Sequence, residues 1–544
     1  MLRGVSLALI LLAPAALLAD ETSATDKLRI LYSTRFTFTD DGLPLVTVEI
    51  MSGQPAVHLR APGGITVRPD GAGGSAIEAD GGDAWTITVE DARPALLWDW
   101  TVVETLAPDD TPGITAALAR WKGRGFEPRS FELGTVFGTG GEVIDTRELR
   151  IAVDPVAAGK GAARAAELGK RFGVATSVQQ ELVRRPSGTI VATSNAKTGA
   201  TTIRNPGVLW FQPRRPGETL TVADVPTLTG GSQRDTGTED RRYWGAVYVT
   251  LDHAGTLVAA NAVAEDKLLA GLVPAEMYPD SPAAALEAQA IAARTELLQK
   301  IGRRNLTDPF LLCSTQQCQV YAGAGKEDPR TTRAVDATRG LVLLRDGGGL
   351  VDVRYSASCG GHGEDNDAIW GGDPDPSLRG RNDGTSGGMS RITDDNLDAF
   401  LDGSGDAWCN RSKLGKAKFR WTEQISSTDL TARVAAEYPE VGQVQQLIAR
   451  HRGVSGRIGV LAIQGDKATV EVSGDLHIRR LLGGLRSTLF EVTRRGETWV
   501  IRGGGYGHGV GMCQLGAIGM AGAGKPYPQI LGYYYRGSHL HRLY

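Results

Sequence analysis

The sequence PAEMYPDSPAAALEAQAIAARTELL, residues 274–298, carries the clearest structural signal in the chain. Apolar residues recur at three- and four-residue steps over residues 285–301, which predicts a helix. The prolines just before this segment stop any earlier helix near Glu276 and bend the chain on its way into the next one. Glu276 is therefore expected at the junction between two elements.

A second segment, GGGYGHGVGMCQLGAIGMAGAG at residues 503–524, is dense in glycine. The dinucleotide-binding pattern G-x-G-x-x-G fails at every start in 503–511, and Pro526 stands where a P-loop needs Ser or Thr. What remains is backbone with little side-chain bulk around His508 and Gln514. Such a backbone suits close approach by a ligand or another strand.

Composition and the amino terminus limit the possible functions. The 544 residues include 59 Lys and Arg against 62 Asp and Glu, a balance that gives no reason to expect nucleic acid as a partner. Residues 1–19 resemble a cleavable secretory signal, and their apolar run is too short to span a bilayer. We expect an exported protein of the periplasm, cell envelope or extracellular space, not an integral membrane protein after cleavage.

The chain is predicted to be a multidomain α+β protein. Short alternating runs such as LPLVTVEI at 43–50 predict a β-rich domain over 27–125. Residues 146–215 read as a compact α+β module, similar in order and size to the SPOR peptidoglycan-binding module. Residues 228–240 are polar and rich in Gly, Thr and Asp, which predicts a linker before a final α+β domain over 241–544.

Three separated blocks in 241–544 resemble the SpoIID/LytB family. They contain the motifs A-x-A-Q-A-I-A-A-R-T, S-C-G-G-H and G-Y-G-H-G-V-G-M, in this order. The resemblance implies an action on bacterial cell wall. Family members are either lytic transglycosylases that cut glycan strands stripped of peptides, or amidase enhancers. Glycan strands, and in the second case a cell-wall amidase, are thus the expected partners.

Lytic cleavage of a MurNAc–GlcNAc bond needs a single carboxyl group. It protonates the leaving oxygen and then, as a base, removes the proton of the MurNAc C6 hydroxyl. Its pKa must be raised by a partly dry setting. The resemblance points to Glu276 for this role. Glu287 is the rival carboxylate, and it stands where relatives commonly carry Lys.

Several other polar residues match the family blocks and have hydrogen-bonding capacity suited to sugar hydroxyls. For Arg294 a structural role, bonding carbonyls or an acid, is the stronger alternative. Tyr533 and the two tyrosines after it could form a stacking face, with core packing as the alternative. The substrate-binding set predicted from the resemblance is Gln289, Arg294, Gln319, Tyr355, His362, His508, Gln514 and Tyr533.

The cysteines allow metal binding or disulfides. Cys313 and Cys318 with Cys359 and His362 could form a Cys₃His zinc site, and some family members bind zinc near this region. Those relatives read T-H-C-Q, whereas this chain has Gln317 in place of the His.

An oxidising compartment favours disulfides over that zinc site. The pairs to expect are Cys313–Cys318 and Cys359–Cys409, which leaves Cys513 free. The predicted chemistry requires no cofactor, and zinc remains an alternative to the disulfides.

Overall fold

The structure, a computed structural model, describes residues 31–32, 37–39, 41–69, 75–79, 84–139, 141–195, 199–228, 235–313, 321–384, 388–403 and 405–544. The predicted signal at 1–19 therefore lies outside the described residues. Within them, none of the helices is both long and apolar enough to cross a membrane.

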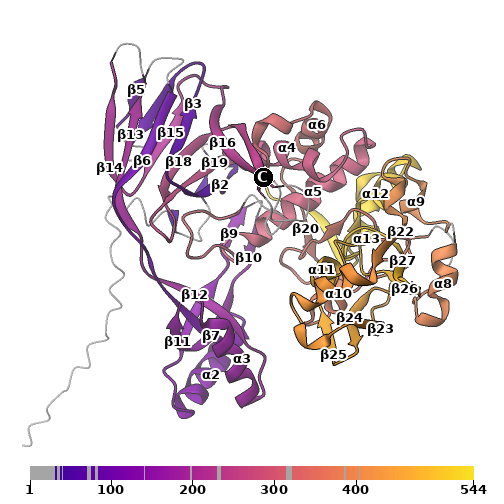
Figure 1. The fold of residues 1–544 in the computed structure, drawn as a ribbon. Coiled ribbons are helices and arrows are strands. Elements are labelled where there is room, and N and C mark those ends of the chain that lie inside the picture. The colour runs from indigo at the N-terminus through magenta and orange to yellow at the C-terminus, as the bar shows by residue number, and fades with distance from the viewer. Residues whose placement is uncertain are drawn as a thin grey trace, which may run out of the picture.

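The amino-terminal part is a sandwich of two antiparallel sheets (Figure 1). One sheet has the order β1-β2-β19-β18-β15-β4-β5 and the other β14-β13-β6-β3-β16-β17. Inward-facing residues of both sheets, such as Val57, Trp85 and Phe211, share one core. The strands are β1 Thr37–Phe38, β2 Pro44–Gln54, β3 Val57–Arg60, β4 Ile65–Arg68, β5 Ile77–Ala79, β6 Ala84–Arg93, β13 Ser187–Ser194, β14 Thr202–Pro206, β15 Leu209–Pro213, β16 Leu220–Leu228, β17 Asp235–Tyr243, β18 Ala246–Leu251 and β19 Leu257–Ala264.

A module with alternating strands and helices is inserted between β6 and β13. Its sheet has the order β12-β7-β11-β8, with every neighbouring pair antiparallel, which is the β-α-β-β-α-β arrangement. The β9–β10 hairpin instead places Phe137 and Ile144 in the sandwich core. The elements are β7 Leu96–Leu106, α2 Thr111–Gly123, β8 Arg129–Leu133, β9 Val136–Thr139, β10 Glu142–Asp145, β11 Glu148–Ala157, α3 Gly161–Phe172 and β12 Ser177–Arg184.

These pairings correct three predicted boundaries. The module spans 96–184 and not 146–215, because β7 pairs with β11 and β12 while β13 to β15 belong to the sandwich. Of the predicted linker at 228–240, Leu228 and residues 235–240 instead belong to β16 and β17, which pair up to Leu228 and Asp235, and the residues between them lie outside the described part of the chain. The β17 strand lies at a sheet edge with exposed side chains, so its composition is polar. The last domain does not start at 241, since β18 and β19 belong to the sandwich.

The carboxy-terminal part is built around α5, which contacts α4, α6, α12, α13 and β20. The helix begins at Ala283 and ends at Lys300, close to the predicted 285–301. The elements are α4 Glu265–Glu276, α5 Ala283–Lys300, η1 Gly323–Lys326, α6 Pro329–Ala337, β20 Leu341–Arg345, β21 Tyr355–Ser356, α7 Asn366–Trp370, η2 Pro376–Leu378, α8 Asp394–Asp402, α9 Trp408–Arg411, η3 Lys416–Lys418, β28 Met512–Cys513, α12 Gln514–Gly522, α13 Tyr527–Tyr534 and β29 Ser538–Arg542.

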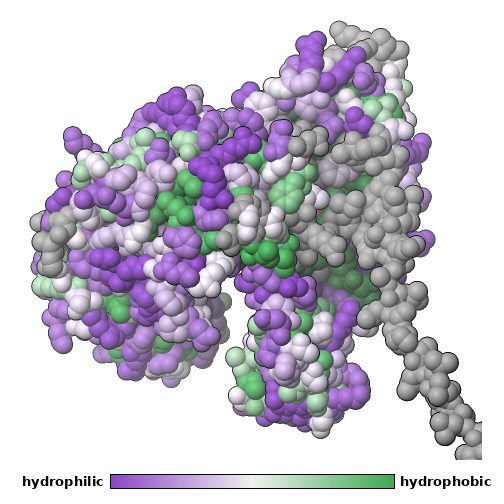
Figure 2. All heavy atoms as spheres, turned by 180° about the vertical axis from the view of Figure 1, so that it is seen from behind, coloured by the Kyte–Doolittle hydropathy of each residue, from purple (hydrophilic) through white to green (hydrophobic). Residues whose placement is uncertain are grey.

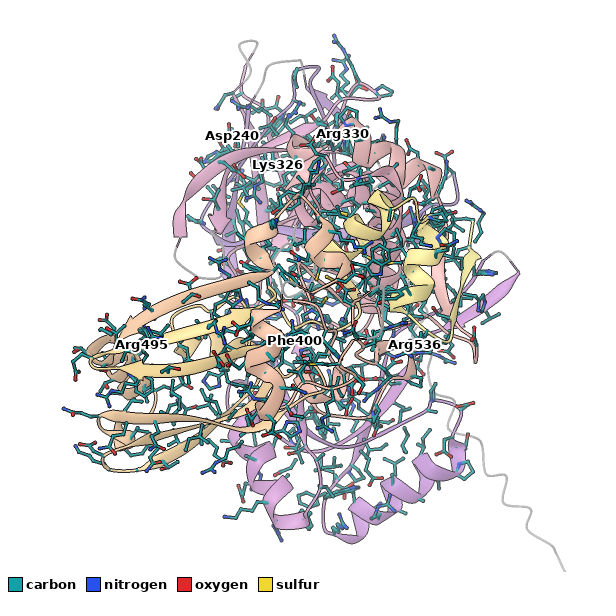
Figure 3. The ribbon with its side chains drawn as sticks, turned by 90° about the vertical axis from the view of Figure 1, so that its right-hand side faces the viewer. Asp240, Lys326, Arg330, Phe400, Arg495 and Arg536 are labelled. Atoms are coloured by element: carbon teal, nitrogen blue, oxygen red, sulfur yellow. The ribbon has the colours of Figure 1, made fainter. Side chains whose placement is uncertain are left out.

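A small lobe with its own apolar core projects from this part. Two three-stranded sheets form it, and Arg495 marks the tip of one of its hairpins (Figure 3). Seen from behind, the surface is mostly hydrophilic, and hydrophobic residues gather near the centre, above the inserted module (Figure 2). The elements of the lobe are β22 Arg420–Ser426, α10 Ser427–Ala435, η4 Pro439–Val441, β23 Val444–Arg452, β24 Ile458–Gly465, β25 Thr469–Ser473, α11 Asp475–Leu481, β26 Phe490–Arg495 and β27 Thr498–Gly504.

Candidate active site

A cavity of about 200 Å³ lies between the end of α4 and the start of α12. It is open to solvent on one side and is lined by both apolar and polar side chains, as expected for a ligand site. The lining residues are Pro274, Ala275, Glu276, Met277, Tyr278, Pro279, Ala357, Lys418, Gln514, Leu515 and Ile518.

Glu276 is placed in this cavity by the way α4 ends. The helix contains Pro274 and has Glu276 as its last residue, which confirms the predicted junction. The next residue, Met277, is extended and donates its N–H to the Val273 carbonyl at 2.9 Å. Its side chain is only 3% exposed, so packing fixes the bend and leaves Glu276 half-buried at the cavity wall.

The setting of Glu276 changes its acidity. Burial, followed by repulsion from Glu296, raises the pKa of Glu276 from 4.5 to about 7, while Lys300 and the hydrogen bond from Gln514 oppose the shift. A carboxyl group with this pKa is protonated in a large fraction of molecules near neutral pH. It can therefore donate a proton and take one back.

Two charged residues, Glu296 and Lys300, act on the Glu276 carboxyl group, and Arg354 contacts the first of them. Glu296 and Lys300 on α5 form an ion pair of 2.5 Å, and Arg354 lies 3.8 Å from the same carboxylate. The Tyr355 hydroxyl also hydrogen-bonds Glu296. The sequence prediction included Tyr355 and missed the charged residues. Helical spacing could have found Glu296, because it lies seven residues after Gln289 on one helix face.

Replacing Glu296 with Gln is expected to lower the pKa of Glu276. The change removes a negative charge near Glu276 and the 2.5 Å ion pair of Glu296 with Lys300, and both effects favour the ionised form of Glu276. Titration of labelled glutamate side chains by NMR measures the shift. Glu287→Gln is the matched control, since Glu287 does not line the cavity. An unchanged or raised pKa in Glu296→Gln contradicts the prediction.

Gln514 connects the two sides of the cavity. Its Nε2 donates to the backbone carbonyl of Glu276 at 3.0 Å and to Gln289 Oε1 at 3.2 Å. Gln289 is fully buried and does not line the cavity, so it holds Gln514 in place and does not itself meet a ligand there. Both glutamines were predicted from the sequence to bind substrate. In the structure they lie next to each other, and Gln514 is the one that lines the cavity.

The mouth of the cavity is aromatic and basic. The Lys418 ammonium lies 5.0 Å from the centre of the Tyr278 ring and 5.4 Å from that of the Tyr506 ring. The two rings are 40% and 41% exposed, respectively, a setting in which sugars can stack. Tyr506 belongs to the glycine-rich segment 503–511, so that segment does reach the cavity mouth. The sequence analysis did not single out any of these three residues.

His508 lies outside the cavity lining. Its ring centroid is 4.9 Å from that of Trp370, and its Nδ1 accepts the Val510 N–H at 3.0 Å. Burial lowers the pKa of His508 to about 4, so the ring is neutral at pH 7. The adjoining Trp370 is 53% exposed and offers a further stacking surface beside the site.

Besides Gln289, three predicted substrate contacts are internal and are corrected here. Arg294 is fully buried and donates to Glu265 at 2.6 Å and to the Thr338 carbonyl at 2.8 Å. These contacts agree with the structural role that was the alternative to substrate binding. His362 is also fully buried, with its ring nitrogens 2.7 Å from the Gly363 carbonyl and 3.2 Å from the Ser390 carbonyl. Neither side chain can reach a sugar.

The third correction concerns the tyrosines. The hydroxyls of Tyr533 and Tyr535 donate to backbone carbonyls of Asn382 and Arg354 at 3.0 and 2.7 Å. Tyr534 is buried and donates to a carboxylate. They pack into the core on different partners, so the expected stacking face does not form.

The predicted cysteine arrangement is also corrected. Cys313 is disulfide-bonded, and its predicted partner Cys318, like Gln319, lies outside the described residues. Cys359 and Cys409 are both free, with their sulfurs 3.7 Å apart. The alternative, a zinc site at Cys313, Cys318, Cys359 and His362, does not form either, because Cys313 has no free thiolate and His362 bonds backbone carbonyls.

Among the described residues that line the cavity, Glu276 is the one carboxylic acid, and aromatic rings stand at the cavity mouth. Residues 253–344 match the family described as Stage II sporulation protein, and residues 364–511 match a domain of unknown function, DUF8618. Together with the relatives that follow, these matches support the similarity of this chain to the SpoIID/LytB family.

Curated relatives match about half of the chain. An uncharacterized protein of Brachyspira hyodysenteriae is 28% identical over 54% of this chain and 71% of its own length. The amidase enhancer of Bacillus subtilis is 29% identical over 50% of this chain and 40% of its own length. The stage II sporulation protein D of Bacillus amyloliquefaciens is 27% identical over 54% of this chain and 76% of its own length.

Proposed function

We propose that this protein is an exported lytic transglycosylase that cleaves the β-1,4 bond between MurNAc and GlcNAc in peptidoglycan glycan strands. The observation that carries the proposal is Glu276, a half-buried carboxyl group in an open cavity, with a pKa of about 7. The resemblance and the match to the family described as Stage II sporulation protein support the substrate class. Periplasm, cell envelope or extracellular space is the proposed location.

The proposed reaction uses Glu276 twice. The protonated carboxyl group gives its proton to the glycosidic oxygen as the bond from C1 to that oxygen breaks. The C6 hydroxyl oxygen of the same MurNAc bonds to C1, and the Glu276 carboxylate accepts the hydroxyl proton. The acid is restored, no water is consumed, and the new end is 1,6-anhydro-MurNAc.

The composition of the cavity supports this chemistry over hydrolysis. A hydrolase needs a second carboxylate, as nucleophile or as base for water, at a distance of about 5 to 9.5 Å. Among the described residues that line the cavity, Glu276 is the only carboxylate. An internal sugar hydroxyl removes the need for the second one.

Lys418 supports strands stripped of peptides as the substrate. Removing the peptide leaves a free lactyl carboxylate on each MurNAc, and Lys418 offers an ammonium group at the cavity mouth. Tyr278 and Tyr506 offer ring faces whose centres lie 5.0 and 5.4 Å from this ammonium group. Together they match an anionic sugar better than an intact peptide-bearing one.

Incubation of the purified chain with peptide-free glycan strands tests the proposal. Mass spectrometry is expected to show 1,6-anhydro-MurNAc ends that increase with time. Reducing ends in their place would show hydrolysis and overturn the reaction. Strands that stay intact would overturn the enzymatic proposal as a whole.

A second function is favoured by one relative, which is named an amidase enhancer. In this alternative the same cavity holds glycan without cleaving it, and the inserted module at 96–184 adds a second contact with the strand. The chain would then raise the turnover of a cell-wall amidase while the strands remain uncut. Measuring amidase turnover and anhydro ends in the same reaction distinguishes the two functions.

A further inference from the structure

Four buried side chains meet behind the candidate active site. Cys359 follows β21, Asp383 lies in a loop, Cys409 is in α9, and Cys513 ends β28. Their ligand atoms all lie within 4.8 Å of one another, and each residue is at most 2% exposed. Segments far apart in the sequence thus bring three sulfurs and one carboxylate oxygen together in the core.

The spacing of the sulfurs fits a metal better than a disulfide. The Cys359 and Cys409 sulfurs are 3.7 Å apart. A disulfide places them about 2.05 Å apart. Two thiolates on a tetrahedral zinc ion, each about 2.3 Å from the metal, are about 3.8 Å apart. The two sulfurs would have to move very little to bind zinc, whereas they would have to approach by more than about 1.5 Å to form a disulfide.

The surroundings hold these groups as ligands. The N–H groups of Cys359 and Gly516 donate to the Cys513 sulfur at 3.1 and 3.3 Å. The Cys409 N–H and the Tyr534 hydroxyl donate to Asp383 at 3.0 and 2.8 Å. Hydrogen bonds of this kind orient metal ligands and stabilise their anionic forms.

The buried Arg457 and the half-buried Arg420 balance the charge. Arg457 Nη2 donates to the Cys359 carbonyl at 3.0 Å, and Arg420 Nη1 donates to the neighbouring Gly360 carbonyl at 2.8 Å. Three thiolates, one carboxylate and a divalent cation carry a net charge of about -2, which two guanidinium groups offset. The positive charges of Arg420 and Arg457 therefore match the negative charge that the site would carry with zinc bound.

We propose that Cys359, Asp383, Cys409 and Cys513 form a structural zinc site. Three soft sulfur ligands select zinc over magnesium or calcium, and four buried protein ligands leave no open position for a catalytic water. This set differs from the one predicted from the sequence and shares only Cys359 with it.

The site would fix the back wall of the cavity. Gln514 and Leu515 directly follow Cys513, and Ala357 lies two residues before Cys359, and all three line the cavity. Zinc would thus tie β21, α9 and the start of α12 together at the point where Gln514 holds the Glu276 backbone. This role holds whether or not the chain cleaves glycan.

Metal analysis of the purified chain, incubated with ZnCl₂ and desalted, tests the proposal. About one zinc per chain is expected, with a loss of tenfold or more in Cys409→Ser and in the milder Asp383→Asn. The matched control is Cys313→Ser, which removes a cysteine of the disulfide and should keep its zinc. Zinc retained in Cys409→Ser but lost in Cys313→Ser would overturn the assignment.

Two measurements on the unchanged chain keep the test independent of folding defects in the variants. CoCl₂ in place of zinc is expected to give intense visible absorption typical of tetrahedral cobalt with thiolate ligands. After unfolding in chelator without reductant, thiol titration should find three free thiols. One free thiol would show a second disulfide, and no cobalt spectrum would show no thiolate site. Either result overturns the proposal.

Discussion

Replacing Glu276 with Gln is expected to lower the rate of 1,6-anhydro-MurNAc formation by about 10³-fold, because general acid–base catalysis by one residue contributes about 10² to 10⁴-fold. The amide has nearly the same shape but cannot donate and recover a proton. Gln514 bonds the backbone carbonyl of residue 276, a contact the change leaves in place. Binding of glycan strands should therefore persist, and the loss should fall on kcat rather than KM.

The control for this change is Glu287→Gln, a carboxylate on α5 outside the cavity, which should keep full activity. The unchanged enzyme should lose kcat/KM as the pH rises above about 7, since the free enzyme must carry the proton. Activity that survives in Glu276→Gln, or a rate that grows through pH 8, would contradict the assignment.

The raised pKa also has a consequence for stability. An acid whose pKa is higher in the folded than in the unfolded chain stabilises the fold below its unfolded pKa, and this stabilisation is lost as the pH rises toward about 7. Glu276→Gln removes the cost of burying the charge. The variant is expected to melt at a higher temperature than the unchanged chain at pH 8 and at the same temperature at pH 4. Thermal unfolding at both values measures this, and a lower melting temperature at pH 8 would contradict it.

The sequence predicted those parts of the site that depend on local rules. Proline chemistry and helical periodicity placed Glu276 at the end of one helix and before the next. The surrounding charges come from α5 and from the loop before β21, and the cavity mouth includes Lys418 from η3. Such long-range contacts have no local signature, so the sequence did not show which polar residues of the family blocks face the cavity. Arg294 and His362 match those blocks, but both are fully buried and form hydrogen bonds within the protein.

The predicted boundaries failed for a related reason. The sequence of a strand indicates an extended conformation, but which strands pair with it depends on the arrangement of the whole sheet. β7 reads like the strands before it, yet it pairs with β11 and β12 across the inserted module. The polar strand β17 reads like a linker because it lies at an edge, where side chains remain exposed.

Replacing Arg294 with Met is expected to destabilise the carboxy-terminal part by about 3 to 5 kcal/mol, because breaking a buried ion pair leaves one charge without compensation. Arg294 and Glu265 are both fully buried, and their contact is 2.6 Å long. Among the described residues, the Glu265 carboxylate keeps the Tyr544 hydroxyl, at 2.6 Å, as a hydrogen-bond donor after the change. Urea unfolding, with hydrogen exchange of α5 as the probe, measures the loss.

The double variant Arg294→Met with Glu265→Gln distinguishes two causes of the destabilisation: the loss of the ion pair itself and the burial of the Glu265 charge without a compensating cation. It should be more stable than Arg294→Met alone, since the remaining amide carries no charge to bury. Arg204→Ala, which breaks an exposed ion pair with Glu90, is the control and should leave the unfolding midpoint unchanged. If Arg294→Met matched this control, the buried pair would not hold α5 to α4.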